Sequence, residues 1–216
     1  MGNTILNLSG VYEEEEWNLP DSQTVNLKGL EGCCRYCDEG ALSAIRSALA
    51  PLPYSGIHWI DTGDYHYLSF LWMEKIRLPF VLALFDNHAD DQAGAFGDGL
   101  LSCGSWVRTA RLELPLMKAD YLNRSDIPDK LPVYLSIDMD VLSRDFARTG
   151  WSHGDMDMEE LLSAIDGVAS AHRIIGVDIC GGLTRAQGAV TEDLRINKEC
   201  RKMLADYFGS HPPASG

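Results

Sequence analysis

The sequence predicts an α/β protein in which a mainly parallel sheet lies between two layers of helices. Short, continuously apolar runs alternate along the chain with segments of helical periodicity. Continuous apolar runs are typical of strands that are buried on both faces, as in a parallel sheet. The repeated order of strand and helix therefore favours a three-layer α/β/α architecture.

Each element is predicted from its own pattern. At the N-terminus, residues 4–8 and 11–17 are expected to form edge strands, and the four consecutive glutamates of the second segment a solvated face. The central strands are the short apolar runs at residues 57–60, 80–85, 133–137 and 174–179. Helices are predicted at residues 39–49, 65–75, 156–169 and 192–208, with Asp155 as the N-cap of the third.

Length and composition are those of an ordinary globular domain. The 216 residues suit one domain over residues 1–208, followed by a flexible tail at 209–216. A formal charge of −14 disfavours nucleic acid and anionic membranes as partners, because both require a cationic surface. The chain has no apolar run near the ~20 residues of a membrane span and no secretory signal pattern. We therefore expect a cytoplasmic protein.

The six cysteines are spaced irregularly. One CxxC, from Cys34 to Cys37, has no second pair that would complete a zinc site. Reduced thiols with a structural role are expected in a chain without an export signal.

Polar clusters follow the four central strands. They read "WIDTGDYHYLS", "LFDNHADDQ", "LSIDMDVLSRD" and "GVDICGG". In an open α/β sheet the functional crevice lies beyond the carboxyl ends of the strands, so these four clusters are expected to converge on one rim.

The clusters contain a set of oxygen and nitrogen donors. Alternating residues of an extended segment share a face, which brings together the donors of "DNHAD" and those of "SIDMD". Four carboxylates carry a charge of about −4, which two divalent cations would neutralise, and an oxygen-rich donor set suits Mn²⁺ or a similar ion. The candidate metal ligands are His66, Asp86, His88, Asp90, Asp138 and Asp140.

The ordered set of "GDYHYLS", "DNHAD" and "SIDMDVLSRDFARTG" resembles the ureohydrolase (arginase/agmatinase) superfamily. That family carries a Gly-Gly-Asp-His-type segment, a DxHxD segment and an SxDxDxxDP segment in the same order. The resemblance spans residues 57–182 and implies an arginase-like fold, shortened here. The wording "SGVYE", "DTGDYHYLS" and "DNHADDQ" looks particularly like the peptide-arginase branch.

The resemblance implies a metal-dependent hydrolase of a guanidino carbon–nitrogen bond, with two Mn²⁺ ions per chain. One ion would be held by His66, Asp86, Asp90 and Asp138, and the other by Asp86, His88, Asp138 and Asp140. Asp90 would also act in catalysis. The expected substrate is an arginine side chain, plausibly within a peptide, that is converted to ornithine and urea. Relatives of this kind are often oligomeric, so an oligomer is a further possibility.

The chain departs from the family pattern where arginases handle their substrate. Gly181 occupies the position of a glutamate that holds the guanidinium, so Asp178, at a predicted strand end, and Asp91 are the candidate substrate-binding residues. Cys103 occupies the position of a histidine that shuttles protons, so Cys103 and His153 are the candidates for proton transfer.

Two other functions remain open at this point. A deacetylase-like amide hydrolase would use one metal ion on an Asp/His/Asp set, and it would release an acid rather than urea. A non-catalytic, ureohydrolase-like metal-binding module would act through partners, and the substitutions at Gly181 and Cys103 motivate it.

Overall fold

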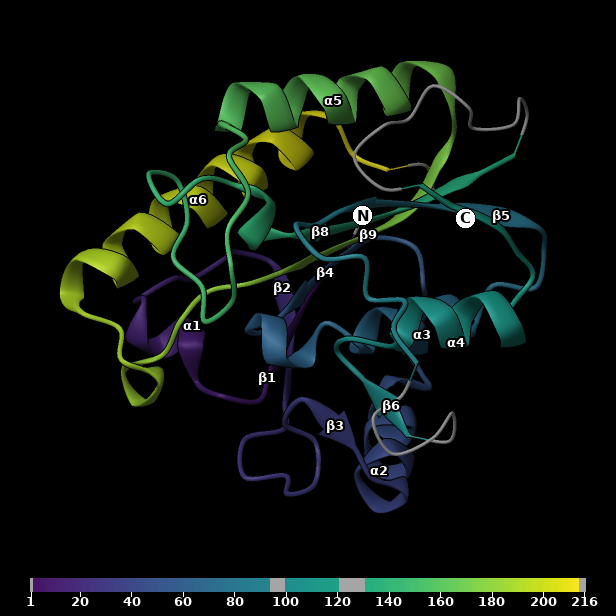
Figure 1. Cartoon of the computed structure of the whole chain (residues 1–216), viewed down its shortest axis with the longest axis horizontal. Coiled ribbons are helices and arrows are strands. Elements are labelled where there is room, and N and C mark those ends of the chain that lie inside the picture. Colours follow the sequence, from purple (N-terminus) through teal and green to yellow (C-terminus); the bar gives the residue numbers. More distant parts are fainter. Residues whose placement is uncertain (1, 94–99, 121–130, 214–216) are drawn as a thin grey trace.

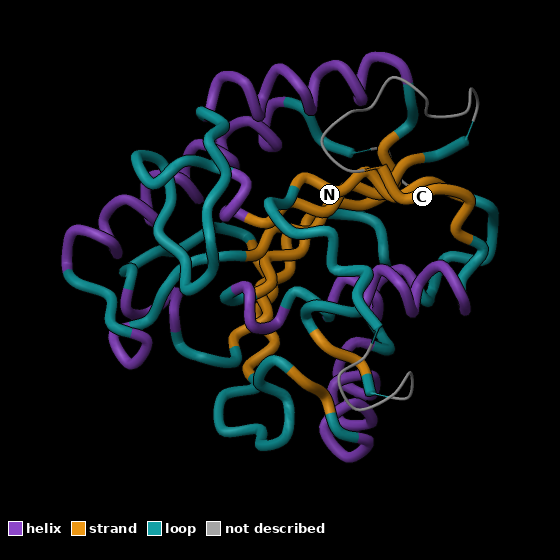
Figure 2. Tube along the Cα trace, in the orientation of Figure 1, coloured by secondary structure: helices purple, strands orange, loops and turns teal. Residues whose placement is uncertain are grey.

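The computed structural model describes residues 2–93, 100–120 and 131–213, which form a three-layer α/β/α molecule (Figures 1 and 2). Within these described ranges, the central sheet contains seven parallel strands in the order β2-β1-β4-β9-β8-β5-β7. Their bounds are Asn3–Asn7 (β1), Ser22–Asn26 (β2), Ile57–Ile60 (β4), Phe80–Phe85 (β5), Leu116–Asp120 (β7), Val133–Asp138 (β8) and Ile174–Cys180 (β9). The predicted fold class is confirmed.

Helices cover both faces of this sheet. Side chains alternate along each central strand, so that each strand supplies apolar residues to both faces. One face packs against α1, α5 and α6, and the other against α2, α3 and α4 (Figure 1). The helices are Val11–Glu14 (α1), Glu39–Leu49 (α2), Leu68–Met73 (α3), Trp106–Glu113 (α4), Met158–Ala171 (α5) and Thr191–Ser210 (α6).

Short elements complete the fold near the carboxyl ends of the central strands. The strands β3 (Tyr36–Cys37) and β6 (Leu101–Ser102) form a separate antiparallel pair. The described ranges contain three single-turn 3₁₀ helices, at Gly63–Tyr65 (η1), Met139–Val141 (η2) and Arg185–Gln187 (η3). The first begins three residues after the end of β4 and the second follows β8 directly, so the polar clusters of these strands lie on tight turns.

The N-terminal segment differs from its prediction. Strand β1 is internal, because β2 and β4 pair with its two sides, and residues 11–17 begin as helix α1 rather than as a strand. The four glutamates do not all face solvent: Glu15 is fully buried and forms an ion pair of 2.6 Å with the equally buried Arg201. A helical turn points successive side chains in different directions, which turns one of the four glutamates toward the core.

Two predicted helices have different boundaries in the structure. The predicted helix over residues 65–75 is the turn η1 followed by the shorter α3. The N-cap of α5 is Asp157 rather than Asp155, and it forms a reciprocal capping box with Glu160. A capping box requires the N-cap residue to lie three positions before a glutamate or glutamine, and Asp157 has this spacing from Glu160.

The last helix of the chain is also longer than predicted. Helix α6 continues to Ser210, so the first two residues of the expected tail are helical, and residues 214–216 lie outside the described part of the chain. Within the described ranges, no helix is both long enough and apolar enough to cross a membrane.

Candidate metal centre

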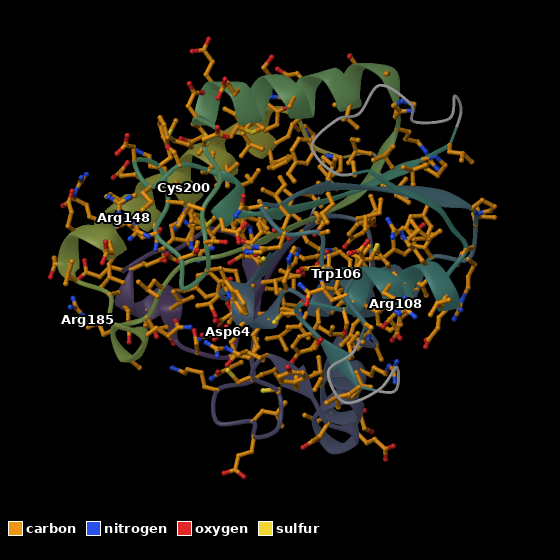
Figure 3. The ribbon with its side chains drawn as sticks, in the orientation of Figure 1. Asp64, Trp106, Arg108, Arg148, Arg185 and Cys200 are labelled. Carbon is orange, nitrogen blue, oxygen red and sulfur yellow. The ribbon has the colours of Figure 1, made fainter. Side chains whose placement is uncertain are left out.

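The site lies at the carboxyl ends of the central strands. Asp138 pairs in register with Cys180, and Cys180 pairs with Ile60. Phe85 pairs with Ile137, so Asp86, the next residue, is level with Asp138. The ends of β4, β9, β8 and β5 therefore form one row, as predicted from the parallel sheet. Trp106, which is labelled in Figure 3, begins α4 and lies beside the site. Its ring centroid is 4.9 Å from that of His66.

Three of the predicted ligands form a first group. His66 Nδ1 lies 3.1 Å from Asp86 Oδ2 and 3.1 Å from Asp90 Oδ2. His66 and Asp86 are buried and come from different strand ends, whereas Asp90 belongs to the loop after β5. The three donor atoms lie within 4.8 Å of one another, which is close enough to hold one ion.

A second group shares Asp86 with the first. His88 Nδ1 lies 2.8 Å from Asp140 Oδ2 and 3.5 Å from Asp86 Oδ1. The two oxygens of Asp86 therefore face different imidazoles. This arrangement matches a carboxylate that bridges two neighbouring ions.

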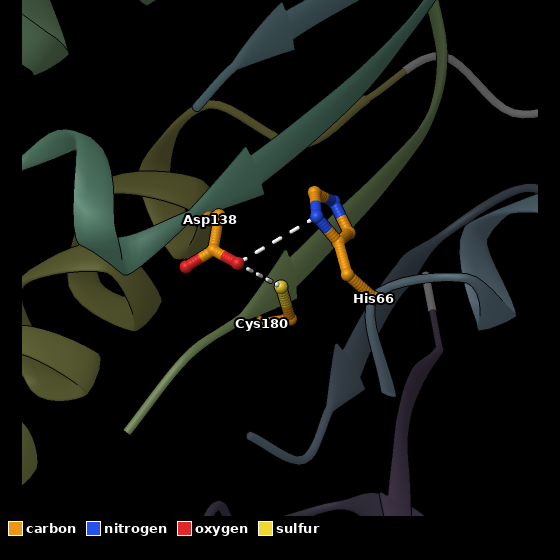
Figure 4. A group of neighbouring side chains, drawn as sticks. All are labelled: His66, Asp138 and Cys180. Carbon is orange, nitrogen blue, oxygen red and sulfur yellow. Dashed lines mark hydrogen bonds and ion pairs between the residues drawn. The ribbon is translucent and has the colours of Figure 1, made fainter. Parts of the chain in front are cut away.

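Asp138, the sixth predicted ligand, lies beside both groups. Its Oδ2 is 3.6 Å from His66 Nδ1 and accepts a hydrogen bond of 3.0 Å from the Cys180 thiol (Figure 4). Its Oδ1 accepts a hydrogen bond of 3.0 Å from the backbone N–H of Asp140. Sequence reasoning missed Cys180, although its place at the end of a buried strand gave a signal of the same kind as that of Asp138.

Outer hydrogen bonds hold the two imidazoles and Asp90. Ser136 Oγ lies 2.9 Å from His66 Nε2, and Ser152 Oγ lies 2.8 Å from His88 Nε2. In each ring Nε2 thus lies within hydrogen-bonding distance of a serine hydroxyl, and Nδ1 lies next to carboxylates. Metal-ligating histidines are held in the same way, with the second ring nitrogen on a hydrogen-bonding partner. Trp106 Nε1 donates a hydrogen bond of 2.7 Å to Asp90 Oδ2.

The donor set fits divalent cations. Among the described residues, the buried atoms His66 Nδ1 and Asp86 Oδ2 have no hydrogen-bond partner. Buried polar atoms are costly unless they are paired, and these two point at each other across 3.1 Å. Carboxylate oxygens with two imidazole nitrogens are the ligands that Mn²⁺ and similar ions prefer.

The electrostatics of the site favour protons in the absence of a cation. Burial, with the charges of Asp140 and Asp86, raises the pKa of Asp138 to about 8. Burial likewise raises the pKa of Asp140 to about 6. Hydrogen bonds to Asp140 and Asp86 raise the pKa of His88 to about 10. Protons and metal ions therefore compete for the same atoms.

A cavity opens onto these groups. It has a volume of about 350 Å³, and all six predicted ligands line it together with Arg35, Cys103, Ser105 and Trp151 among others. The volume lies at the lower end of the range of small-molecule sites. Arg35 and Trp151 gave no signal in the sequence, because tertiary contacts alone bring their loops to the cavity.

The predicted proton-transfer residues differ in position. Cys103 lines the cavity, but burial and the nearby charge of Asp90 raise the pKa of its thiol to about 12, so it stays protonated near neutral pH. His153 does not line the cavity in the described part of the chain. Its Nδ1 faces the carbonyl of Leu142 at 3.0 Å and its Nε2 accepts from the backbone N–H of Thr149 at 3.2 Å. The ring thus holds a loop together.

The predicted substrate-binding residues also lie elsewhere. Asp178 is not among the described residues that line the cavity: it is fully buried, accepts a hydrogen bond of 2.7 Å from Tyr134 and contacts His58 Nδ1 at 3.0 Å. It lies two residues before the strand end, on the face covered by α2 and α3, and is sealed from the cavity. Asp91 pairs with Arg111 at 3.1 Å and is not among the described residues that line the cavity.

Comparison with solved structures defines the class of fold. The chain superposes on the proclavaminate amidino hydrolase of Streptomyces clavuligerus with a TM-score of 0.66 at 13% identity, covering 96% of this chain and 91% of that one. For the arginase of Entamoeba histolytica, solved in complex with L-ornithine, the TM-score is 0.65 at 11% identity, with coverage of 96% and 98%. The protein therefore has an arginase-like fold.

A sequence relative defines the family more narrowly. An uncharacterized protein of Thermotoga maritima is 32% identical over 196 residues, covering 82% of this chain and 78% of the relative. The chain belongs to the same family as this protein. No family model matches the chain. The relation to the peptide-arginase branch stays a prediction.

Proposed function

We propose that the protein is a binuclear manganese hydrolase that cleaves a guanidino carbon–nitrogen bond. The observation that carries this proposal is the pair of donor groups that share Asp86, with one imidazole on each of its oxygens. The arginase-like fold supports it, because an amidino hydrolase and an arginase have the same architecture. Two donor groups that share Asp86 favour two bound ions over the single ion of a deacetylase-like enzyme.

The residues of the site would divide the work as follows. Asp86 would bridge the ions, with His66 and Asp90 on one side, His88 and Asp140 on the other, and Asp138 beside both. Two such ions supply Lewis acidity that lowers the pKa of a coordinated water to near neutrality. Asp90 is the residue that we assign to accepting a proton next to the reacting carbon, because it lines the cavity and Trp106 fixes its Oδ2 through a hydrogen bond of 2.7 Å.

The remaining roles are narrower than the sequence predicted. Cys103 would form a wall of the cavity, since its thiol holds its proton, and His153 would position the loop that carries Trp151. The substrate we propose is a guanidino compound such as an arginine side chain, in a peptide or free, which would yield ornithine and urea. We propose a cytoplasmic location and leave an oligomer as an expectation.

The test is urea release by the metal-loaded protein. Purified protein would be stripped with EDTA, reloaded with Mn²⁺ and incubated with free and peptidyl guanidino compounds. We expect urea from the wild type, and a loss of at least a hundredfold in the Asp90→Asn variant. Asp91→Asn is the matched control, because it removes the neighbouring carboxylate outside the cavity, and it should retain activity.

Three other outcomes would contradict the proposal. Release of acetate or another acid from amide substrates, without urea, would favour the deacetylase-like enzyme. A protein that binds no divalent cation would exclude the metal centre. If the Asp90→Asn and His88→Ala variants kept the full biological effect of the wild type, the protein would act as a non-catalytic module.

A further inference from the structure

Arg35 carries a positive charge at a cavity whose other charged groups are the proposed ligands. The cavity is lined by four carboxylates and two imidazoles of the metal centre. Among the described residues that line it, Arg35 is the one lysine or arginine. Its Nε pairs with Asp64, so Arg35 offers its remaining N–H groups, rather than an uncompensated charge, to an anionic part of a ligand.

The side chain of Arg35 is held in place but remains accessible. Its Nε donates a hydrogen bond of 3.0 Å to Asp64 Oδ1, and its guanidinium carbon lies 5.5 Å from the centroid of the Trp151 ring. The side chain is 58% exposed. Within the described structure Nε is its sole hydrogen-bonding atom, so both terminal nitrogens are available to a ligand. A guanidinium held in this way offers a planar, bidentate site for a carboxylate.

The backbone beneath Arg35 is specialised for this position. Arg35 has φ +64°, in the left-handed region that non-glycine residues rarely adopt. Its N–H donates to the carbonyl of Asp64 at 3.0 Å, and its carbonyl accepts from the N–H of Cys103 at 3.0 Å. Strained backbone of this kind persists where surrounding contacts enforce it, and it is common at ligand sites.

Asp64 is itself fixed and buried. It accepts a second hydrogen bond of 3.0 Å from Gln187 Nε2, and its side chain is 7% exposed. Asp64 lies four residues after the end of β4 and two residues before His66. The anchor of Arg35 is therefore part of the same turn that carries a proposed metal ligand, which sets the guanidinium in a constant position relative to the metal centre.

We propose that Arg35 binds a carboxylate of the substrate at the mouth of the cavity. This inference rests on the proposed function: the guanidino end of the substrate lies at the metal centre, and an anionic end lies at Arg35. The substrate class is then a guanidino acid rather than a guanidino amine, because a carboxylate accepts hydrogen bonds from the terminal N–H groups of Arg35 and an ammonium group cannot. The carboxylate belongs either to a free amino acid or to a peptide, and these two sources share one chemistry.

Steady-state urea release from matched substrates tests the assignment. L-Arginine, agmatine (the same molecule without its carboxylate), and short peptides ending in arginine with a free or an amidated C-terminus would be compared in Mn²⁺. We expect Arg35→Gln to raise the KM for L-arginine or for the free-acid peptide about tenfold to a hundredfold, with a small change in kcat. The KM for agmatine and the amidated peptide should stay the same or fall.

Two further variants separate binding from folding. Arg35→Lys retains the charge and should recover part of the affinity for the carboxylate substrates. Arg46→Gln breaks another arginine–carboxylate pair, with Glu74 at 2.9 Å, far from the cavity lining, and should leave every KM unchanged. An equal effect of Arg35→Gln on carboxylate and non-carboxylate substrates, or no effect on either, would overturn the proposal.

Calorimetric binding keeps this result distinct from failure of the proposed function. If no guanidino compound yields urea, the hydrolase proposal fails, whereas binding of L-arginine to the Mn²⁺-loaded protein still reports on Arg35. Preferential binding of L-arginine over agmatine that is lost in Arg35→Gln would support the subsite. Equal binding of both compounds, or binding of neither, would overturn it.

Discussion

Replacement of Asp138 by asparagine is expected to stabilise the metal-free protein while it removes the response to metal. Asp138 is 3% exposed, and burial with the charges of Asp140 and Asp86 raises the pKa of its carboxyl to about 8. The unfolded chain has the ordinary value of 3.8. Because the pKa is higher in the folded protein, the contribution of this group to stability falls as the pH rises from 3.8 to about 8.

The magnitude follows from this difference. About 3 pH units lie between 3.8 and pH 7, and each corresponds to about 1.4 kcal/mol, so a protonated Asp138 costs about 4 kcal/mol at pH 7. Asparagine is neutral and avoids that cost. Its oxygen can still accept from the N–H of Asp140, but the hydrogen bond from Cys180 to Oδ2 is lost, at about 1 kcal/mol. The net expectation is a stabilisation of about 2–3 kcal/mol.

Urea unfolding at pH 7, with EDTA and with Mn²⁺, measures both effects. The wild type should gain stability from Mn²⁺ by mass action, and Asp138→Asn should gain much less. Asp178→Asn is the matched control: this buried carboxylate contacts Tyr134 and His58 outside the cavity, so its loss should destabilise the protein by about 1–3 kcal/mol in either buffer. The reasoning is refuted if Asp138→Asn is less stable than the wild type in EDTA, or if it gains as much from Mn²⁺.

Three other perturbations test the metal centre and the fold. His88→Ala removes a ligand of one group only, so metal analysis should find one Mn²⁺ per chain instead of two, and a loss of both ions would contradict separate groups. The melting temperature of the EDTA-treated protein should fall between pH 6 and 9, because the folded state holds protons on Asp138 up to about pH 8 and on His88 up to about pH 10. The Mn²⁺-saturated protein should lack this fall, and equal profiles would argue against competition between protons and metal. Glu15→Gln should lower the free energy of unfolding by about 3–5 kcal/mol, because it leaves the buried charge of Arg201 unpaired, whereas Glu16→Gln at an exposed position should change it by less than about 0.5 kcal/mol.

The central strands were predictable because they are buried on both faces. Strands β4 and β5 have the predicted bounds, and β8 and β9 are each one residue longer. The edge strand β2, with the sequence SQTVN, has no apolar run, since most of its side chains are at least partly exposed. Helix α4 and strand β7 were also missed, so periodicity was sufficient for the middle of the sheet but not for its periphery.

The proposed ligands were predictable for a different reason. Each lies at the end of a parallel strand or within six residues after it, so the topology brings their positions to one edge. Asp178 shows the limit of this rule, because it lies within the strand and its side chain faces α2 and α3 instead of the rim. Arg35 and Trp106 show the opposite limit: neither follows a central strand, and only tertiary hydrogen bonds, to Asp64 and Asp90, connect them to the site.

The substrate end of the site is where this chain differs most from the pattern that its sequence resembles. Gly181 occupies the position of the guanidinium-binding glutamate of arginases, and its φ of +124° belongs to the region that favours glycine. A Cβ at this position would lie 2.6 Å from Met139 Cβ, so the backbone path itself leaves no room for a side chain. The difference from arginases is therefore more than the exchange of a glutamate for a smaller residue, because the backbone at Gly181 leaves no space for a side chain. In our proposal, recognition of the substrate would therefore depend on the metal centre at one end of the cavity and on Arg35 at the other.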